Sequence, residues 1–161
     1  MAQIFNGRMT AEIEGDFVVF LIGMRINKPW KVGQWLSVAR TMPKMLRELE
    51  QHKELGLLGY QFLPGFPVLF SVQYWRSFEQ LTAYARSASS EHLPAWRAFN
   101  RLVGSSGDVG IWHETYHIQD GQYETIYGNM PAFGMGRVGR LLPVGGRRES
   151  ARERMGNSVR L

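Results

Sequence analysis

The stretch Phe17-Val-Val-Phe-Leu-Ile-Gly-Met24 decides the fold, because it is rich in β-branched and aromatic residues and has no alternating polar positions. A strand of this kind is typical of a sheet that is covered on both faces. The stretch is also far shorter than the roughly 18–20 apolar residues that a membrane span needs. We therefore expect a β-strand here that is covered on both faces.

A long helical region follows this strand. Apolar residues recur at helical spacing from Val32 to about Lys53. Pro43 lies inside this region and cannot occupy an unbroken helix interior without cost. We therefore expect a kink or two short helices, the second capped by Thr41 with Pro43 near its first turn.

Strands and helices alternate over the rest of the chain. The expected elements are strands at 56–63 and 67–74, a helix capped by Ser77 with Gln80 completing a capping box, a short helix at about 93–103, and strands at 108–118 and 122–127 joined by a turn at Asp120-Gly121. This order, βαββαβ with an added C-terminal hairpin strand, predicts a ferredoxin-like α+β fold, an antiparallel sheet with helices on one face. The other face needs cover, so we expect a homodimer whose sheets close into a dimeric α+β barrel.

Positive charge is concentrated at the C-terminal end. Residues 137–161 contain seven arginines and two glutamates, which accounts for the whole net charge of +5. We therefore expect one ferredoxin-like domain at residues 1–136, with no nucleic-acid footprint. Residues 137–161 are expected to form a basic, arginine-rich flexible tail after a glycine-rich stretch without periodicity. Such a tail is either a solubilising extension or a contact for RNA, an acidic partner or a membrane surface.

Several classes of protein are disfavoured by composition. The chain has no cysteine, which removes disulfides, thiolate metal sites and cysteine nucleophiles. No apolar run is long enough for a membrane span, and the N-terminus lacks a basic-then-apolar secretory signal. A cytoplasmic location is therefore expected.

The sequence His113-Glu-Thr-Tyr-His117 has the zinc-protease pattern HExxH, which needs a helix to bring both histidines to one metal. The aromatic and β-branched neighbours of this motif, and the turn residues after it, favour a strand. On a strand, His113 and His117 would share a face but lie roughly 13 Å apart. We therefore expect a strand and no metal site.

A second motif, Gly134-Met-Gly-Arg-Val-Gly139, matches the dinucleotide fingerprint GxGxxG. That fingerprint works as the turn between a strand and a helix of a βαβ unit. The 22 residues that follow are broken by Pro143 and two glycines, so they cannot complete such a unit. We expect a flexible glycine-rich segment instead.

Histidines and tryptophans are the strongest candidates for chemistry. His113 projects from one face of its predicted strand, with Glu114 and Tyr116 on the other. His92 and Trp96 are four positions apart and share a helix face. Each also has a plain structural interpretation: His113 as a satisfied buried histidine, His92 as a surface histidine and Trp96 as a core residue.

Two further candidates lie at strand ends. Trp75 ends the second strand of the predicted pair, and Arg25 follows the first apolar strand. An arginine in that position is more often a surface charge than a ligand.

Several segments resemble a known superfamily. Tyr74-Trp-Arg-Ser-Phe-Glu79, Tyr84-Ala-Arg86 and Glu91-His-Leu-Pro-Ala-Trp-Arg-Ala-Phe99 resemble the antibiotic-biosynthesis-monooxygenase superfamily. More closely, Gly110-Ile-Trp-His-Glu-Thr-Tyr116 and Tyr123-Glu-Thr-Ile-Tyr-Gly-Asn-Met-Pro131 resemble a largely uncharacterised family named after a fumagillin-pathway monooxygenase. The resemblance covers roughly residues 17–135.

This resemblance implies a dimeric α+β barrel. The superfamily contains cofactor-free oxygenases, haem-degrading enzymes, haem-binding dehydratases and proteins without known activity. The resemblance places Trp75 where haem-degrading members have a tryptophan that presses on the ligand, and His92 near their iron-binding histidine. Phe17–Met24 contains no counterpart of their strand asparagine, which disfavours haem degradation.

We therefore expect a monooxygenase-like enzyme that acts on a small hydrophobic substrate, aromatic or polyketide-like. A cofactor-free reaction with a histidine base is the first mechanism to consider. In cofactor-free oxygenation the protein deprotonates the substrate, which then reduces O₂ itself, and an imidazole suits this role. The candidate bases are His113 and His92, with Trp75 and Trp96 shaping the pocket and Arg25 stabilising an enolate. One alternative is a haem enzyme of the same fold that binds haem through His92. Another is a non-catalytic dimeric module that binds a ligand, or a partner through its basic tail.

Overall fold

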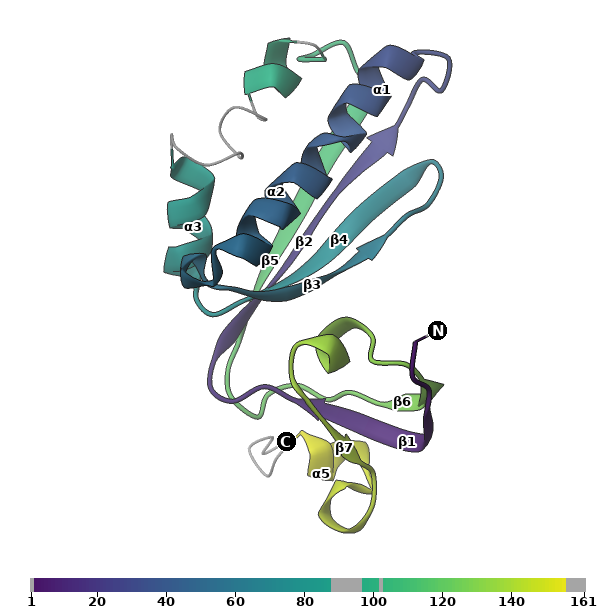
Figure 1. Cartoon of the computed structure of the whole chain (residues 1–161), viewed down its shortest axis with the longest axis vertical. Helices are drawn as coiled ribbons and strands as arrows, with labels where there is room; N and C mark the ends of the chain where they lie inside the picture. The colour runs from purple at the N-terminus through teal and green to yellow at the C-terminus, as the bar shows by residue number, and fades with distance from the viewer. Residues whose placement is uncertain (1, 88–96, 102, 156–161) are drawn as a thin grey trace.

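The computed structural model describes residues 2–87, 97–101 and 103–155, and its strands form two antiparallel sheets (Figure 1). The elements are β1 (Phe5–Glu12), β2 (Phe17–Ile26), α1 (Val32–Ala39), α2 (Thr41–Gln51), β3 (Leu57–Leu63), β4 (Val68–Trp75), α3 (Phe78–Arg86), β5 (Val109–Ile118), β6 (Tyr127–Met130), β7 (Arg140–Pro143) and α5 (Ala151–Arg154), with short 3₁₀ helices η1 (Lys53–Leu55), η2 (Gly134–Arg137) and η3 (Gly146–Arg148). The larger sheet has the strand order β3-β4-β2-β5, and α1, α2 and α3 lie over one of its faces. The smaller sheet has the order β6-β1-β7 and lies at one end of the larger one. None of the described helices has the length and apolar character of a membrane-spanning helix.

The apolar stretch that begins at Phe17 occupies the interior of the larger sheet. It forms β2, which pairs with β4 along one edge and with β5 along the other. Both neighbours are antiparallel to it, and β3 completes the sheet beyond β4. The ferredoxin-like α+β fold predicted from the sequence is confirmed, and its apolar strand is interior to the sheet because both of its edges have partners.

The helical region after β2 is divided as predicted. α1 ends at Ala39 and α2 begins at Thr41, which places Pro43 in the first turn, where its missing N–H is not needed. The predicted cap is wrong, however. The Thr41 hydroxyl donates to the carbonyl oxygen of Ser37 at 3.2 Å, so Thr41 continues the preceding turn instead of capping the second helix.

The predicted cap of α3 is half confirmed. The Ser77 hydroxyl accepts a hydrogen bond from the Gln80 backbone N–H at 3.2 Å. The Gln80 side chain does not close the capping box, because it donates to the carbonyl oxygen of Glu54 instead. Leu81 and Tyr84 are the buried residues of α3. Of the short helix expected at 93–103, residues 97–101 are helical and residues 93–96 and 102 lie outside the described residues.

The segment after β5 departs from the predicted hairpin. A turn occurs at Asp120-Gly121, but the next strand is β6, which pairs with β1 in the smaller sheet instead of returning along β5. Side-chain bonds lead the chain away from β5: the Tyr123 hydroxyl accepts from the Ile13 N–H at 2.8 Å and donates to the Ile13 carbonyl at 2.9 Å. The additional strand exists, but it belongs to a sheet whose first strand, β1, was not predicted.

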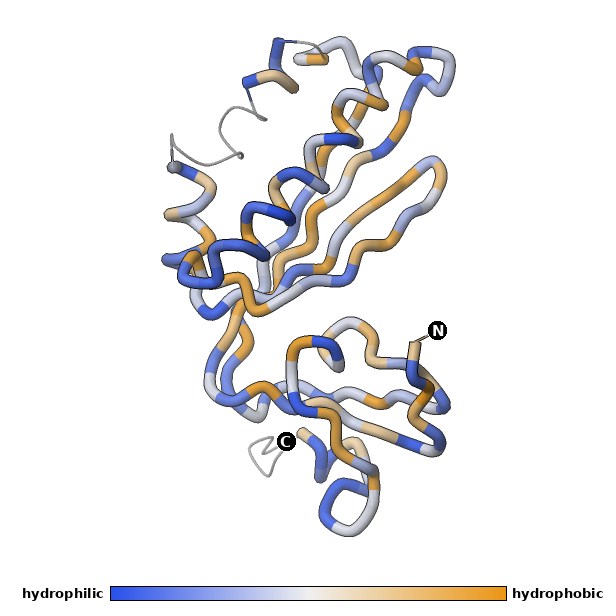
Figure 2. The backbone as a smooth tube through the Cα atoms, viewed as in Figure 1, coloured by the Kyte–Doolittle hydropathy of each residue, from blue (hydrophilic) through white to orange (hydrophobic). Residues whose placement is uncertain are grey.

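The smaller sheet covers part of the second face of the larger one. Phe17 and Tyr74 from the larger sheet form a buried cluster with Ala11, Ile13 and Met135. Burial raises the pKa of the Tyr74 phenol to about 12. A part of the cover that we expected from a second copy of the chain is therefore supplied by the chain itself. Figure 2 shows apolar residues along the strands of both sheets.

The glycine-rich motif is packed inside this cluster and is not a flexible segment, contrary to the prediction. Gly134, Met135 and Gly136 are buried in η2. Gly134 has a φ of +52°, which favours glycine, and a Cβ on Gly139 would lie 2.4 Å from the carbonyl oxygen of Glu12. The glycines thus allow the backbone to approach β1 closely, which has nothing to do with dinucleotide binding.

Part of the predicted tail forms secondary structure. β7 pairs with β1 from Met9↔Pro143 to Glu12↔Arg140. The Arg154 guanidinium donates to Glu124 Oε1 at 2.5 Å, and Arg148 Nε donates to Glu12 Oε1 at 2.8 Å. These arginines therefore bind the chain's own carboxylates. Residues 156–161 lie outside the described residues.

Candidate functional site

A cavity of about 850 Å³ lies between the helix-facing side of the larger sheet and the helices. All four strands of the sheet contribute to its floor, and α1, α2, α3 and residues 98–99 contribute to its other walls. Most of the lining is apolar and includes Phe20, Met24, Met42, Met45 and Leu69. Its size and character suit a small hydrophobic ligand.

One transverse row of the sheet crosses the floor of this cavity. Phe62 pairs with Ser71, Ser71 with Ile22, and Ile22 with His113, and all four residues line the cavity. Adjacent strands are about 4.8 Å apart, so the Cα atoms of Ser71 and His113, two strands apart, are separated by about 10 Å. The two polar members of the row therefore lie apart on the floor of one apolar chamber, and Ser71 is buried whereas His113 is exposed.

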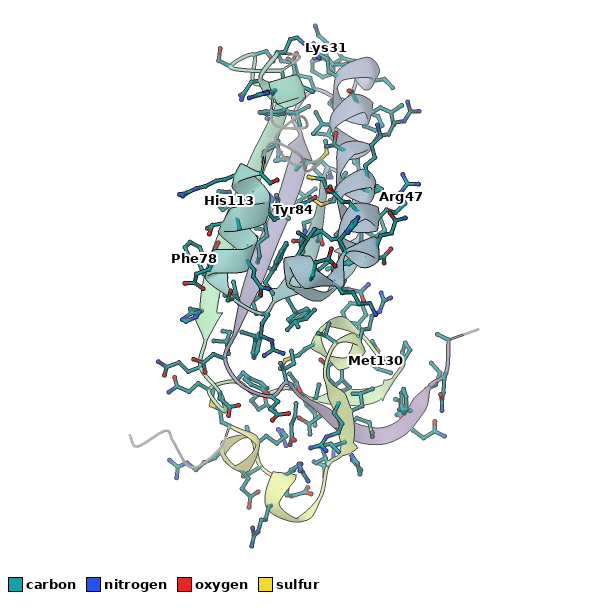
Figure 3. All side chains as sticks on the ribbon, turned by 60° about the vertical axis from the view of Figure 1, so that its left-hand side comes forward. Lys31, Arg47, Phe78, Tyr84, His113 and Met130 are labelled. Atoms are coloured by element: carbon teal, nitrogen blue, oxygen red, sulfur yellow. The ribbon has the colours of Figure 1, made fainter. Side chains whose placement is uncertain are left out.

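His113 lies on β5, which pairs with β2. The predicted strand for the HExxH segment is confirmed, and His113 is on its cavity side while Glu114 and Tyr116 are on the other. Its imidazole packs against Phe20 with ring centroids 5.6 Å apart and is itself solvent-exposed. Figure 3 shows His113 and Phe78 on the α3 side of the molecule. His113 is thus both in contact with the apolar lining and open to proton exchange.

A buried polar pair follows Ser71 on the same, helix-facing side of β4. The Trp75 indole N–H donates to Gln73 Oε1 at 2.9 Å, and the Gln73 amide donates to Met42 Sδ at 3.7 Å. Ser71 is 0% exposed, and its hydroxyl has no hydrogen-bond partner among the described residues. Sequence reasoning missed Ser71 and Gln73. The available signal was that they are the polar residues, two positions apart, of the otherwise apolar strand up to Tyr74, and so share one face.

The other candidate residues lie elsewhere or outside the described residues. Trp75 is 1% exposed and packs in the core against Tyr84, with ring centroids 5.9 Å apart, instead of lining the cavity. Arg25 is exposed on the opposite face of β2 and donates to Asn27 Oδ1 at 2.6 Å. His92 and Trp96 lie outside the described residues. Of the five candidates, the structure places His113 alone on the wall of the cavity within the described part of the chain.

The outer face of β5 carries a separate polar pair. The Tyr116 hydroxyl donates to Glu114 Oε2 at 2.5 Å, and this hydrogen bond raises the pKa of the Tyr116 phenol. Both side chains are exposed and point away from the cavity. Among the described residues, no group of three or more His, Cys, Asp or Glu side chains is arranged to hold a metal ion.

Solved structures and a curated relative are similar to this chain. Two crystal structures of aldoxime dehydratases, one in complex with butyraldoxime, superpose with TM-scores of 0.66 and 0.65 at 15% and 19% identity. Each superposition covers 86% of this chain and 43% or 44% of the dehydratase. At that identity the likeness concerns the fold alone.

The curated relative is Monooxygenase af470 of Aspergillus fumigatus. It is 28% identical over 179 residues, which cover 99% of this chain and 63% of the relative. The chain thus spans less than two thirds of the length of that relative. The family model described as Monooxygenase af470-like matches residues 17–135, which include all four strands of the cavity floor. This chain therefore belongs to the monooxygenase af470-like family.

Proposed function

We propose that this protein is a monooxygenase-like enzyme that oxidises a small hydrophobic substrate, aromatic or polyketide-like, in the cavity between sheet and helices. The observation that carries the proposal is the position of His113, an imidazole on the wall of an apolar chamber of about 850 Å³. Membership of a family named after a monooxygenase supports the reaction class.

The reaction can proceed without a cofactor when the substrate has an acidic C–H group. A base removes one proton from a CH₂ group, and the resulting carbanion gives one electron to O₂. The two radicals combine into a peroxide, which takes up a proton and then loses water to leave a carbonyl group. One oxygen atom of O₂ ends in the product and the other in water, so the substrate CH₂ and O₂ account for all atoms and electrons.

In this scheme His113 accepts the proton from the substrate carbon and returns it to the peroxide. The ring of Phe20 packs on the imidazole and holds it against the cavity. Arg25 and Trp75 have no part in this scheme, because neither lines the cavity. The roles expected for His92 and Trp96 stay predictions.

Haem is the cofactor that the resemblance allows, and the described lining fits it only in part. The apolar walls suit the faces of a porphyrin, and His113 offers an imidazole for the iron. The described lining residues include no arginine or lysine to pair with the two carboxylates of haem. Haem therefore has no part in the proposed reaction.

The experiment is oxygen consumption with 2-tetralone, an enolisable aromatic ketone of suitable size, in wild type and in two histidine variants. His113→Ala should lower the rate by a factor of about 10² or more, the usual contribution of a positioned base. His117→Ala is the matched control, because it lies on the same strand and face but does not line the cavity. With ¹⁸O₂, one labelled oxygen atom should appear in the product. An unchanged rate in His113→Ala would remove His113 as the base.

A further inference from the structure

Ser71 is a polar residue that neither the fold nor the proposed base chemistry explains. It sits on β4, between Phe62 on β3 and Ile22 on β2, so its flanking partners in the sheet are apolar. Its hydroxyl is completely buried and has no hydrogen-bond partner among the described residues. An unpaired buried hydroxyl destabilises the folded state, so this position needs another explanation than packing.

We propose that Ser71 is the anchor for an oxygen atom of the substrate, and that the substrate is a neutral apolar molecule with a hydroxyl or carbonyl group at the end that enters first. This inference rests on the proposed function, because it assumes that the substrate occupies the same cavity. A serine hydroxyl can donate to a carbonyl oxygen or accept from a hydroxyl group, so it suits either form. The bound ligand would satisfy the hydroxyl that the protein leaves unpaired.

The geometry of the row in the sheet sets the shape of the substrate. Ser71 and His113 lie in one transverse row, separated by Ile22, with about 10 Å between their Cα atoms. A molecule held by Ser71 at one end therefore presents its other end to His113. A molecule of two fused rings has the length to span this row. Its anchoring oxygen would be on one ring and its reacting carbon on the other.

Access to Ser71 requires a movement of the cavity lining, since the hydroxyl is closed off from solvent. Met42 and Met45 line the same cavity from α2, and Met42 Sδ already contacts the neighbouring Gln73 amide. Methionine side chains are unbranched and adapt readily to a new neighbour. Their displacement by the ligand exposes the hydroxyl and closes the apolar surface around the ligand.

The electrostatics of the lining favour a neutral oxygen. Among the described lining residues the titratable side chain is His113, and the remaining polar members are hydroxyl groups: Ser37, Ser71, Thr41, Thr82 and Thr115. A carboxylate or phosphate at the inner end would lose its hydration without gaining a cation, which is unfavourable in an apolar chamber. A phenol, an alcohol or a ketone fits this chamber.

Equilibrium dialysis with 2-naphthol and naphthalene tests the anchor, because the two probes differ only in one hydroxyl group. Ser71→Ala should weaken 2-naphthol binding about tenfold, the usual value of one hydrogen bond, and leave naphthalene binding within about twofold. Thr82→Val is the matched control: the Thr82 hydroxyl also belongs to the cavity wall, but it donates to the carbonyls of Phe78 and Glu79. It should leave the ratio of the two affinities unchanged.

The melting temperature of Ser71→Ala provides a second readout that does not need a ligand. Because the hydroxyl is unpaired, its removal should leave the melting temperature unchanged or raise it. A lower melting temperature together with an unchanged affinity ratio would show a purely structural hydroxyl and overturn the anchor. In that case binding of both probes to wild type would leave the proposed function intact. Failure of both probes to bind wild type would overturn the anchor and the proposed apolar substrate together.

Discussion

Gly23 and Trp112 are paired across β2 and β5 so closely that a Cβ on Gly23 would lie 2.8 Å from the indole nitrogen Nε1. The same Cβ would lie 2.6 Å from Phe70 Cβ. The rings of Phe70 and Trp112 meet over this glycine, with centroids 5.9 Å apart. Because Gly23 has no side chain, these two aromatic residues from the neighbouring strands can pack together on the face opposite the helices.

Gly23→Ala should consequently destabilise the protein by about 1–3 kcal/mol, since neither backbone nor ring can move without disturbing the sheet. Gly33→Ala is the control, because nothing lies within 4 Å of the added methyl group in α1. That substitution should be neutral or stabilising by up to about 1 kcal/mol. Urea unfolding followed by circular dichroism measures both. Equal stability of the two variants would refute the packing argument.

The homodimer stays a prediction, and the same aromatic face provides its test. The smaller sheet covers the cluster around Phe17 and Tyr74, while Phe70 and Trp112 lie outside this cluster. If a second copy covers them, Trp112→Glu should convert a dimer into a monomer, as measured by light scattering after size exclusion. Val32→Glu, which changes an exposed apolar residue on α1, should not alter the mass. A wild-type monomer would contradict the prediction.

The pairing of Lys28 with Asp108 makes part of the stability depend on pH. Lys28 Nζ lies 2.5 Å from Asp108 Oδ1, and this contact lowers the pKa of the Asp108 carboxyl. A lowered pKa in the folded state contributes stability above the unfolded pKa of about 4, and this contribution is lost as the pH falls through the folded value.

Lys28→Met should therefore lower the free energy of unfolding at pH 7 more than at pH 2, where Asp108 is becoming protonated in both proteins. Lys44→Met, on the exposed side of α2, is the control for the loss of a lysine. The measurement is urea unfolding of the three proteins at both pH values. A difference between Lys28→Met and wild type that is the same at both pH values would rule out this linkage.

The Arg154–Glu124 pair connects the C-terminal segment to the rest of the chain. The side chains of Arg154 and Glu124 are 8% and 24% exposed, and Arg154 also donates to the carbonyls of Arg148 and Glu149. Glu124→Gln should destabilise the protein by about 1–3 kcal/mol, because it leaves a buried guanidinium without its charge partner. Glu149→Gln, in a surface pair with Arg8, should cost less than about 1 kcal/mol.

Hydrogen exchange of the β7 amides shows whether Glu124→Gln weakens the smaller sheet alone or the whole protein. Faster exchange in Glu124→Gln, confined to β1 and β7, is the expected result, since the pair holds the segment that follows β7. Exchange that is equally slow in both variants would show that the smaller sheet does not depend on this pair.

Haem titration tests the alternative cofactor. Because no cationic side chain is among the described lining residues, we expect no saturable Soret band at stoichiometric haem. A saturable band that shifts in His113→Ala would instead identify this histidine as an iron ligand and contradict the cofactor-free proposal.

The central part of the fold could be predicted from the sequence because its signals are local. The composition of β2, Pro43 in the helical region and the Ser77 cap each specify one element through its own residues. The smaller sheet could not be predicted in this way. β1 mixes small, polar and apolar residues without regularly alternating burial, and its partners are fixed by contacts that are remote in the sequence, such as the Thr10 and Thr125 hydroxyls 3.1 Å apart.

The candidate site was predictable only where strand periodicity sufficed. The alternation along β5 placed His113 on the side opposite Glu114, and the structure has His113 on the cavity wall. The resemblance suggested a ligand contact for Trp75, but in the structure a buried hydrogen bond to Gln73 holds the Trp75 indole in the core. Arg25 was misplaced because it is one position out of phase with the cavity side of β2.

The pairing of β1 has a consequence for the order in which the protein can fold during synthesis. The Gly7 N–H donates to Asn129 Oδ1, a bond between residues 122 positions apart, and β7 follows later still. At ribosomal rates of about 5–20 residues per second, β1 leaves the ribosome on the order of ten seconds before its partners. Throughout that interval β2 and its neighbours can assemble, whereas β1 has no strand to pair with until β6 and β7 have been made.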